Sequence, residues 1–130
     1  MAGKKPSAIS GREFGILKLL WESGPLTVRE VRARLARDEE IPYTTVLGLM
    51  QLMEKKGYVR HEAVGKTYRY SASVRRRPTL RLVLRDFISR FFDGSAQSMV
   101  SGLAECSELN PEVWEQLQRE MRSRREKRRE

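Results

Sequence analysis

Hydrophobic side chains in the first part of the chain recur three and four residues apart, which is the spacing of one face of a helix. The positions are Phe14, Leu17, Leu20 and Trp21. Ser10 precedes this stretch and Glu13 follows three residues later, as in a capping box, where each side chain bonds to the other residue's backbone N–H. Gly24 and Pro25 then end the pattern. A first helix is therefore predicted between Ser10 and Gly24.

Two more helices are predicted in the same way. Thr27 and Glu30 form another capping box, and the apolar stripe that follows is Val28, Val31 and Leu35. A third helix begins near Pro42, because proline is favoured in a first turn, and ends at Gly57. Its predicted core face comprises Val46, Leu49, Met50 and Met53. Its other face comprises Thr44, Leu47, Gly48, Gln51 and Lys55.

Two short segments after Gly57 alternate with a period of two, as a half-exposed β-strand does. They are "YVRHEA" and "TYRYSA", and "VGK" between them predicts a hairpin turn. Three helices and a hairpin in this order describe a winged helix-turn-helix domain. We therefore predict a mainly α fold with a small β-hairpin, in which residues 8–74 form this N-terminal domain.

Helical spacing returns after the basic break "SVRRRP". It predicts helices over residues 79–92 and 95–106 and a third that starts at Asn110 and Pro111. So short a segment cannot easily bury its large aromatic side chains alone, so we expect residues 78–122 to be a helical dimerisation domain. The alternative is that these helices fold back on the N-terminal domain. The expected interface residues are Leu80, Val83, Leu84, Phe87, Ile88, Phe91, Val113, Trp114, Leu117 and Met121.

The charge of the chain points to a polyanionic partner. Lys and Arg total 26 against 17 acidic residues, a net charge of +9, which favours nucleic acid first and an anionic membrane surface second. The alternative is a basic surface without such a partner. Residues 123–130 are a charge run, which we expect to be a disordered basic tail.

Several sequence features bear on where the protein acts. The single cysteine, Cys106, excludes an intramolecular disulfide and fits a reducing compartment. The first ten residues lack the apolar core of a signal peptide, and no apolar run approaches the roughly 18 residues of a membrane span. We expect a cytoplasmic protein without membrane insertion.

The sequence offers little that could support catalysis, because an active site needs several converging groups. The one histidine, His61, lies in a predicted strand, where a surface position or a phosphate contact is expected. Cys106 has no obvious histidine partner, and the two residues alone would make a poor metal site. No Cys-x-x-Cys, His-Glu-x-x-His, phosphate-binding-loop or dinucleotide-binding glycine pattern occurs. We expect neither an enzyme nor a bound cofactor or metal.

DNA binding has positive support in the third predicted helix and the hairpin. A helix can enter the major groove, where base edges present distinguishable donors and acceptors. The base-reading candidates are Tyr43, Thr44, Thr45, Gly48 and Gln51. The phosphate-contacting candidates, which would give affinity without sequence choice, are Lys55, Lys56, Arg60, Lys66 and Arg69. The arginine run at 75–77 would extend this set.

These segments together resemble the penicillinase-repressor family of the BlaI/MecI type. The resemblance covers residues 8–118 and is carried by "LLWESGPLTVREV", "YTTVLGLMQLMEKKGYV" and "GKTYRYSA". It implies a homodimeric transcriptional repressor with winged helices that bind palindromic double-stranded DNA operators of β-lactamase or cell-wall stress genes. It also implies release when a membrane sensor metalloprotease triggers cleavage in the dimerisation domain. The family's wing tyrosines correspond to Tyr68 and Tyr70.

The chain departs from the family pattern in the third predicted helix and in the C-terminal helices. The family often has Thr where Gly48 stands and Arg where Leu52 stands. Cleavable relatives have an Asn-Phe bond where this chain has Gly102-Leu103, and a copper-responsive branch has paired cysteines where this chain has Cys106 alone. Two alternatives therefore stay open: a winged-helix regulator released by a small molecule or protein partner without cleavage, and a protein-interaction module that no longer reads bases.

Overall fold

The computed structural model describes residues 9–35 and 40–129. The chain divides into two compact units, Met1–Leu84 and Arg85–Glu130. The division falls within the fourth helix, whereas the predicted boundary was the basic break at residues 73–78; the predicted start at residue 8 lies outside the described residues. The elements are α1 (Gly11–Ser23), β1 (Leu26–Thr27), α2 (Val28–Leu35), α3 (Tyr43–Lys56), β2 (Val59–Val64), β3 (Thr67–Ala72), α4 (Arg76–Phe91), α5 (Ala96–Glu105) and α6 (Pro111–Arg129).

Both predicted capping boxes are confirmed. At α1, the backbone N–H of Ser10 donates to Glu13 Oε1 at 2.8 Å, and that of Glu13 donates to Ser10 Oγ at 3.1 Å. At α2, the N–H of Thr27 donates to Glu30 Oε1 at 3.0 Å, and that of Glu30 donates to Thr27 Oγ1 at 3.2 Å. Each box satisfies two backbone donors that a helix start leaves unpaired.

The third helix ends where the sequence predicts. Gly57 has φ 89°, and its N–H donates to the carbonyls of Glu54 and Met53. A positive φ costs glycine little and other residues more, so glycine is the natural residue for this stop. The predicted core residues of α3 are buried except Leu49. Leu49, like Leu47, is only partly buried against the core.

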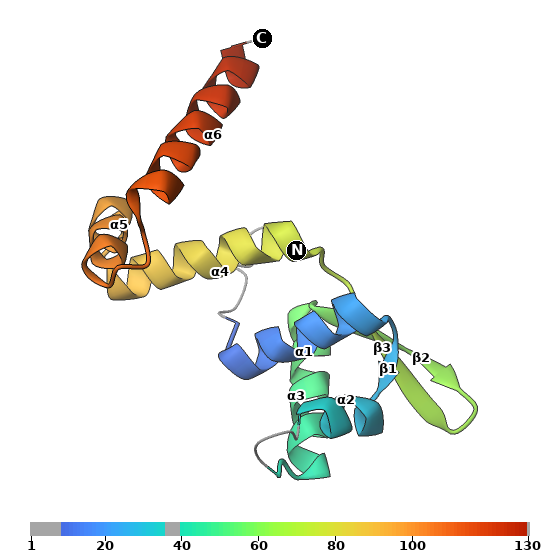
Figure 1. Ribbon diagram of the computed structural model, residues 1–130. Helices are drawn as coiled ribbons and strands as arrows, with labels where there is room; N and C mark the ends of the chain where they lie inside the picture. Colours follow the sequence, from blue (N-terminus) through green and yellow to red (C-terminus); the bar gives the residue numbers. More distant parts are fainter. Residues whose placement is uncertain (1–8, 36–39, 130) are drawn as a thin grey trace. The chain divides into compact units, whose positions relative to one another are not determined.

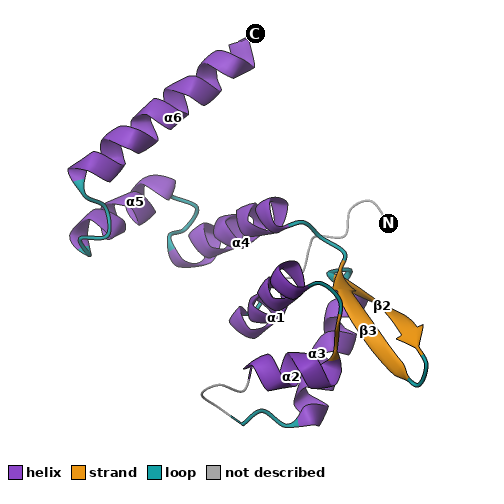
Figure 2. Cartoon of the chain, turned by 45° about the vertical axis from the view of Figure 1, so that its right-hand side comes forward, coloured by secondary structure: helices purple, strands orange, loops and turns teal. Residues whose placement is uncertain are grey.

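A third strand adds to the predicted hairpin. The strands β2 and β3 pair through a tight turn in which Gly65 has φ 63°, and β1 pairs antiparallel with β3, with Leu26 opposite Tyr70. The sheet order is therefore β1-β3-β2, and Figure 2 shows β2 and β3 side by side as the two arms of the hairpin. Two residues are too few for a periodic signal, so the pattern could not reveal β1.

The buried core lies in the N-terminal unit, where α1, α2 and α3 gather beside the hairpin (Figure 1). Trp21 at the end of α1 donates through Nε1 to the carbonyl of Val74 at 2.9 Å, which ties the helix to the segment after the sheet. Tyr70 brings the sheet into the core. The buried apolar residues are Ile16, Leu17, Leu20, Leu26, Val28, Val31, Ile41, Val46, Met50, Met53, Tyr58, Val59 and Tyr70.

The last three helices also follow the predicted pattern. Side-chain caps begin two of them: Ser95 accepts from the N–H of Ser98 at 3.1 Å, and Asn110 accepts from that of Val113 at 2.8 Å. The described residues include no helix with both the length and the apolar character to cross a bilayer.

The structure corrects one prediction about this region. Residues 123–129 are not an irregular tail, because α6 continues as one helix to Arg129, while residue 130 lies outside the described residues. Arg, Lys and Glu are good helix formers, no Gly or Pro follows Pro111, and cations near a helix C-terminus are favoured by the helix dipole.

Candidate nucleic-acid interface

A cleft of about 330 Å³ joins the start of α2, the first half of α3 and the turn of the hairpin. It brings the base-reading candidate Tyr43 and the phosphate candidate Lys66 into one site, although they are far apart in sequence. Arg29, which sequence reasoning missed, also lines it. The lining residues are Thr27, Val28, Arg29, Tyr43, Leu47, Lys66, Thr67, Tyr68 and Tyr70. A groove of this kind, with cations and aromatic rings at its wall, suits a polyanionic strand.

The outer face of α3 has a polar, exposed surface. Thr44, Gly48, Gln51 and Lys55 are all exposed, and their spacing of three and four residues places them along one side of the helix. Thr45 and Leu52, also exposed, lie beside this side. The opposite side packs into the core through Val46, Met50 and Met53. The burial of one face thus leaves the other free for a partner.

Gly48 has no packing reason to be glycine. A Cβ built at this position meets nothing within 4 Å, and the residue lies in the helix interior without a positive φ. Glycine inside a helix costs about 1 kcal/mol relative to alanine. Nothing inside the described part of the domain requires glycine at this position. A glycine that lowers helix stability without such a reason is expected where a helix must come close to another molecule.

The phosphate candidates differ in whether their side chains bond to other groups of the same domain. Lys55, Lys66 and Arg69 are exposed, whereas Arg60 donates through Nη1 to the carbonyl of Ala72 at 3.1 Å and is still exposed. Lys56 forms an ion pair with Glu13, with Nζ 3.0 Å from Oε2. That pair joins α1 to α3, so we leave Lys56 out of the phosphate set.

Burial and hydrogen bonding shift the pKa of Glu13 in opposite directions, and the side chain is only 3% exposed. Burial alone would raise its pKa, but the N–H and hydroxyl of Ser10 and the ammonium of Lys56 together hold the pKa below the usual value. On α2, the N–H and hydroxyl of Thr27 lower the pKa of Glu30, and the charge of Arg69 adds to the effect. Both carboxylates therefore serve the fold as anions.

His61 connects the hairpin to the end of α3. Its Nδ1 lies 2.6 Å from Oε1 of Glu54, and its ring lies against Tyr68 and Tyr70, with centroids 4.3 and 5.4 Å apart. Burial and the charge of Glu54 raise the pKa of Tyr70. His61 is exposed, as the sequence predicts, and it also has partners within the domain.

The described part of the chain contains no group of three or more His, Cys, Asp or Glu side chains placed to hold a metal ion. Cys106 is exposed at the end of α5.

The predicted interface residues lie on α4 and α6 and remain largely uncovered. Of the ten predicted residues, Val83 and Ile88 are half-buried and the other eight are exposed. The most exposed are Phe91 and Met121, at 64% each. On α5, Gly102 is half-buried, with its built Cβ 3.9 Å from the ring of Phe92, and Leu103 is exposed.

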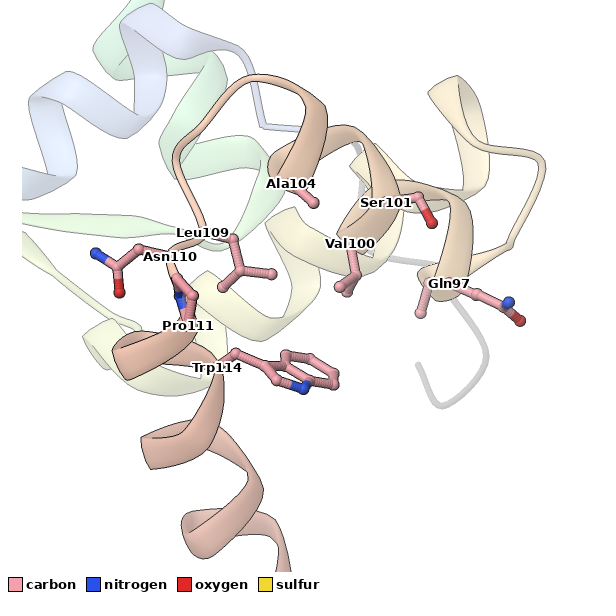
Figure 3. A pocket seen from close by; sticks show the side chains of 9 residues that line it. Gln97, Val100, Ser101, Ala104, Leu109, Asn110, Pro111 and Trp114 are labelled. Atoms are coloured by element: carbon pink, nitrogen blue, oxygen red, sulfur yellow. The ribbon is translucent and has the colours of Figure 1, made fainter.

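A second, larger pocket of about 700 Å³ lies between α5 and α6 (Figure 3). Trp114 of α6 and Val100 of α5 both line it. None of its lining side chains is ionisable. They are Ala96, Gln97, Val100, Ser101, Ala104, Leu109, Asn110, Pro111 and Trp114.

Three packed helices, an exposed polar face on the third and a three-stranded sheet with a projecting hairpin define a winged-helix DNA-binding protein. The penicillinase repressor family model matches residues 9–123. The chain belongs to this family and is a DNA-binding repressor, as the sequence resemblance predicted.

Curated relatives agree with this assignment and are named as repressors. The penicillinase repressor of Bacillus licheniformis is 25% identical over 114 residues, covering 88% of this chain and 89% of its own length. The penicillinase repressor of Staphylococcus aureus is 22% identical over 117 residues, covering 90% and 92%. The solution structure of the Bacillus licheniformis BlaI monomeric form with the blaP half-operator aligns with a TM-score of 0.47 and 22% identity, over 55% of this chain and 87% of that one.

Proposed function

We propose that this chain acts as a homodimeric transcriptional repressor on palindromic operators. The observation that carries the proposal is the cleft between α3 and the hairpin. Tyr43 and Lys66 both line this cleft, and the exposed polar face of α3 lies beside it. In a dimer, two such helices would engage half-sites about one DNA turn apart, or a multiple of that.

Base reading is assigned to the exposed side of α3. Gln51 suits adenine, Thr44 and Thr45 suit either a base edge or a thymine methyl group, and Gly48 admits a close approach of the helix backbone. Tyr43 stands where the helix meets the cleft. Since all five are exposed, binding would require no rearrangement of the core.

Phosphate neutralisation is assigned to cations around that helix. Lys66 and Arg29 line the cleft, and Lys55, Arg60 and Arg69 are exposed nearby on α3 and the sheet. Such contacts raise affinity for any sequence, and each adds about 0.9 to the slope of log affinity against log salt.

Dimerisation is assigned to the C-terminal helices. No side chain of α5 or α6 is buried, although α4 and α6 carry exposed Phe87, Phe91 and Trp114. Large exposed aromatic side chains favour a protein partner, and a second copy is the simplest one that satisfies a two-fold operator.

Release by a membrane sensor protease would act on Gly102-Leu103. That bond lies inside α5, so cleavage would require local opening of the helix. Detection of a fragment that begins at Leu103 in cells treated with a β-lactam would support this route, and an intact chain under induction would exclude it.

The pocket between α5 and α6 favours a second candidate, release by a small molecule without cleavage. Its volume of about 700 Å³ suits a drug-sized ligand, and mostly apolar walls with a few polar groups are typical of such sites. Titration with benzyl alcohol and with intact benzylpenicillin, followed by Trp114 fluorescence in a Trp21→Phe chain, tests it. A ligand that quenches Trp114 and dissociates the operator complex would favour this candidate; neither probe doing so would count against it.

The central test is fluorescence anisotropy on the DNA upstream of the protein's own gene and on a scrambled duplex, across a salt series. We expect the first duplex to bind at least about 10³-fold more tightly. Gln51→Ala should weaken the specific duplex alone, whereas Lys66→Gln should weaken both and lower the salt slope by about 1. Equal, steeply salt-dependent binding of both duplexes by the unaltered protein would refute sequence-specific binding at that operator.

A further inference from the structure

The C-terminal end of α6 is unusually rich in positive charge. Residues 119–129, here called the basic end of α6, carry seven cations and two carboxylates, a net charge of +5. The cations are Arg119, Arg122, Arg124, Arg125, Lys127, Arg128 and Arg129. All seven are exposed, and among the described residues none of them forms an ion pair.

Dimer packing does not account for this segment. The apolar residues of α6 stop at Met121, and residues 122–129 contain none. A helix that is polar all round gains nothing from a hydrophobic partner. Yet the segment is helical to Arg129, and Figure 1 shows α6 as one unbroken helix. Its cations therefore project from a continuous helix.

The charge is also segregated within the C-terminal unit. Residues 93–118 carry five carboxylates and no Lys or Arg, so the basic end is not part of a uniformly basic surface. Two partners could match it: a nucleic-acid backbone, or the acidic stretch of a second copy.

The density of the charge favours nucleic acid. Eleven helical residues span about 16 Å, and duplex DNA carries one negative charge per about 1.7 Å of its axis, so a duplex that lies along the helix offers several phosphates to the cations on the side that faces it. Six of the seven are arginine, whose guanidinium binds phosphate through two parallel hydrogen bonds. Five carboxylates spread over 26 residues offer a sparser match.

We propose that the basic end of α6 is a second nucleic-acid-binding surface, which contacts the phosphate backbone without reading sequence. The proposal rests on the proposed function for its partner, duplex DNA, and adds a contact outside the winged helix. It predicts that part of the salt dependence of DNA binding comes from the C-terminal unit.

The test compares the full-length protein with two variants. Arg124→Gln, Arg125→Gln, Arg128→Gln and Arg129→Gln together remove four charges and keep good helix formers; the matched control replaces the same four with Lys and keeps the charge. Anisotropy across a salt series should show the Gln variant losing at least about 1 from the slope of log affinity against log salt, with at least about 10-fold weaker binding at low salt. The loss should be equal on specific and scrambled duplexes, and the Lys control should stay close to the unaltered protein.

Other outcomes would overturn the proposal. An unchanged slope in the Gln variant would mean that these cations do not contact DNA. Dimer dissociation in analytical ultracentrifugation, with an unchanged slope at saturating protein, would assign the cations to the acidic stretch of the second copy. Circular dichroism checks that helix content is kept. If the unaltered protein fails to prefer the specific duplex, the proposed function fails, but the slopes on the scrambled duplex still decide the role of the basic end.

Discussion

The two units of this chain differ in how far they bury their apolar side chains. The described part of the N-terminal unit buries thirteen apolar residues in one core, whereas α5 and α6 bury none and α4 buries only Thr79. The first unit thus has the core of an independent domain. The described part of the second has amphipathic helices without a core of its own, which is what the proposed dimerisation would explain. Under the proposed dimerisation, the assembly state can change without unfolding the core that carries α3.

Breaking the core should have the largest effect on stability. Met50 on α3 is fully buried, so Met50→Ala should lower the free energy of unfolding by about 2–5 kcal/mol, through lost burial and the cavity left behind. Leu52→Ala on the same helix, at a side chain that is 44% exposed, should cost less than about 0.5–1 kcal/mol. Urea unfolding followed by circular dichroism measures both, and equal losses would contradict the contrast between the two faces of α3.

A residue of the proposed dimer interface should affect assembly rather than the stability of the core. Trp114 is 41% exposed in one chain, so Trp114→Ala should weaken the dimer by about 2 kcal/mol or more, roughly 30-fold in dissociation constant. The core of the N-terminal unit should melt as before. Sedimentation equilibrium gives the dissociation constant, with Gln116→Ala as the control on another side of α6. A Trp114 variant that dimerises normally would remove this residue from the interface.

The ion pair between α1 and α3 should make the N-terminal unit sensitive to acid. Because the pKa of Glu13 is lowered in the folded protein, its stabilisation is present above the unfolded value near 4.5 and is lost as pH falls through the folded value. Lys56→Gln should cost about 1–3 kcal/mol at neutral pH, since it leaves a buried carboxylate without its cation. Unfolding curves between pH 7 and pH 3 test both effects. A Lys55→Gln variant, at an exposed neighbour, should unfold as the unaltered protein does.

Gly48 should show the smallest stability effect, with an opposite sign for DNA binding. Gly48→Ala fills open space and should stabilise the fold by about 0.5–1 kcal/mol. It should also weaken specific binding about 10-fold, because the added methyl group stands where the helix approaches the bases. Gly15→Ala in α1, whose built Cβ meets Leu35 at an ordinary 4.0 Å, should stabilise the fold without changing anisotropy on DNA. Unchanged DNA binding in the Gly48 variant would show that this glycine has no role in recognition.

Sequence alone determined most elements of the fold. Capping boxes such as that of Ser10 and Glu13, apolar spacing and the turn at Gly65 all act over a few residues, so they can be read without knowing the rest of the chain. The exposed face of α3 followed from the same periodicity. The ending of α6 is also local in origin: the charge run predicts disorder, but the helix propensity of Arg, Lys and Glu prevails and the helix continues to Arg129.

Only the tertiary structure decided which distant residues meet. The pairing of Leu26 with Tyr70, the ion pair of Lys56 with Glu13 and the entry of Arg29 into the cleft beside Lys66 join residues from different elements. None has a local signal, because each depends on how helices and sheet pack around one core rather than on neighbouring residues in the chain. That packing, and not the residue type, turned Lys56 into a structural cation and placed Lys66 in the lining of the cleft.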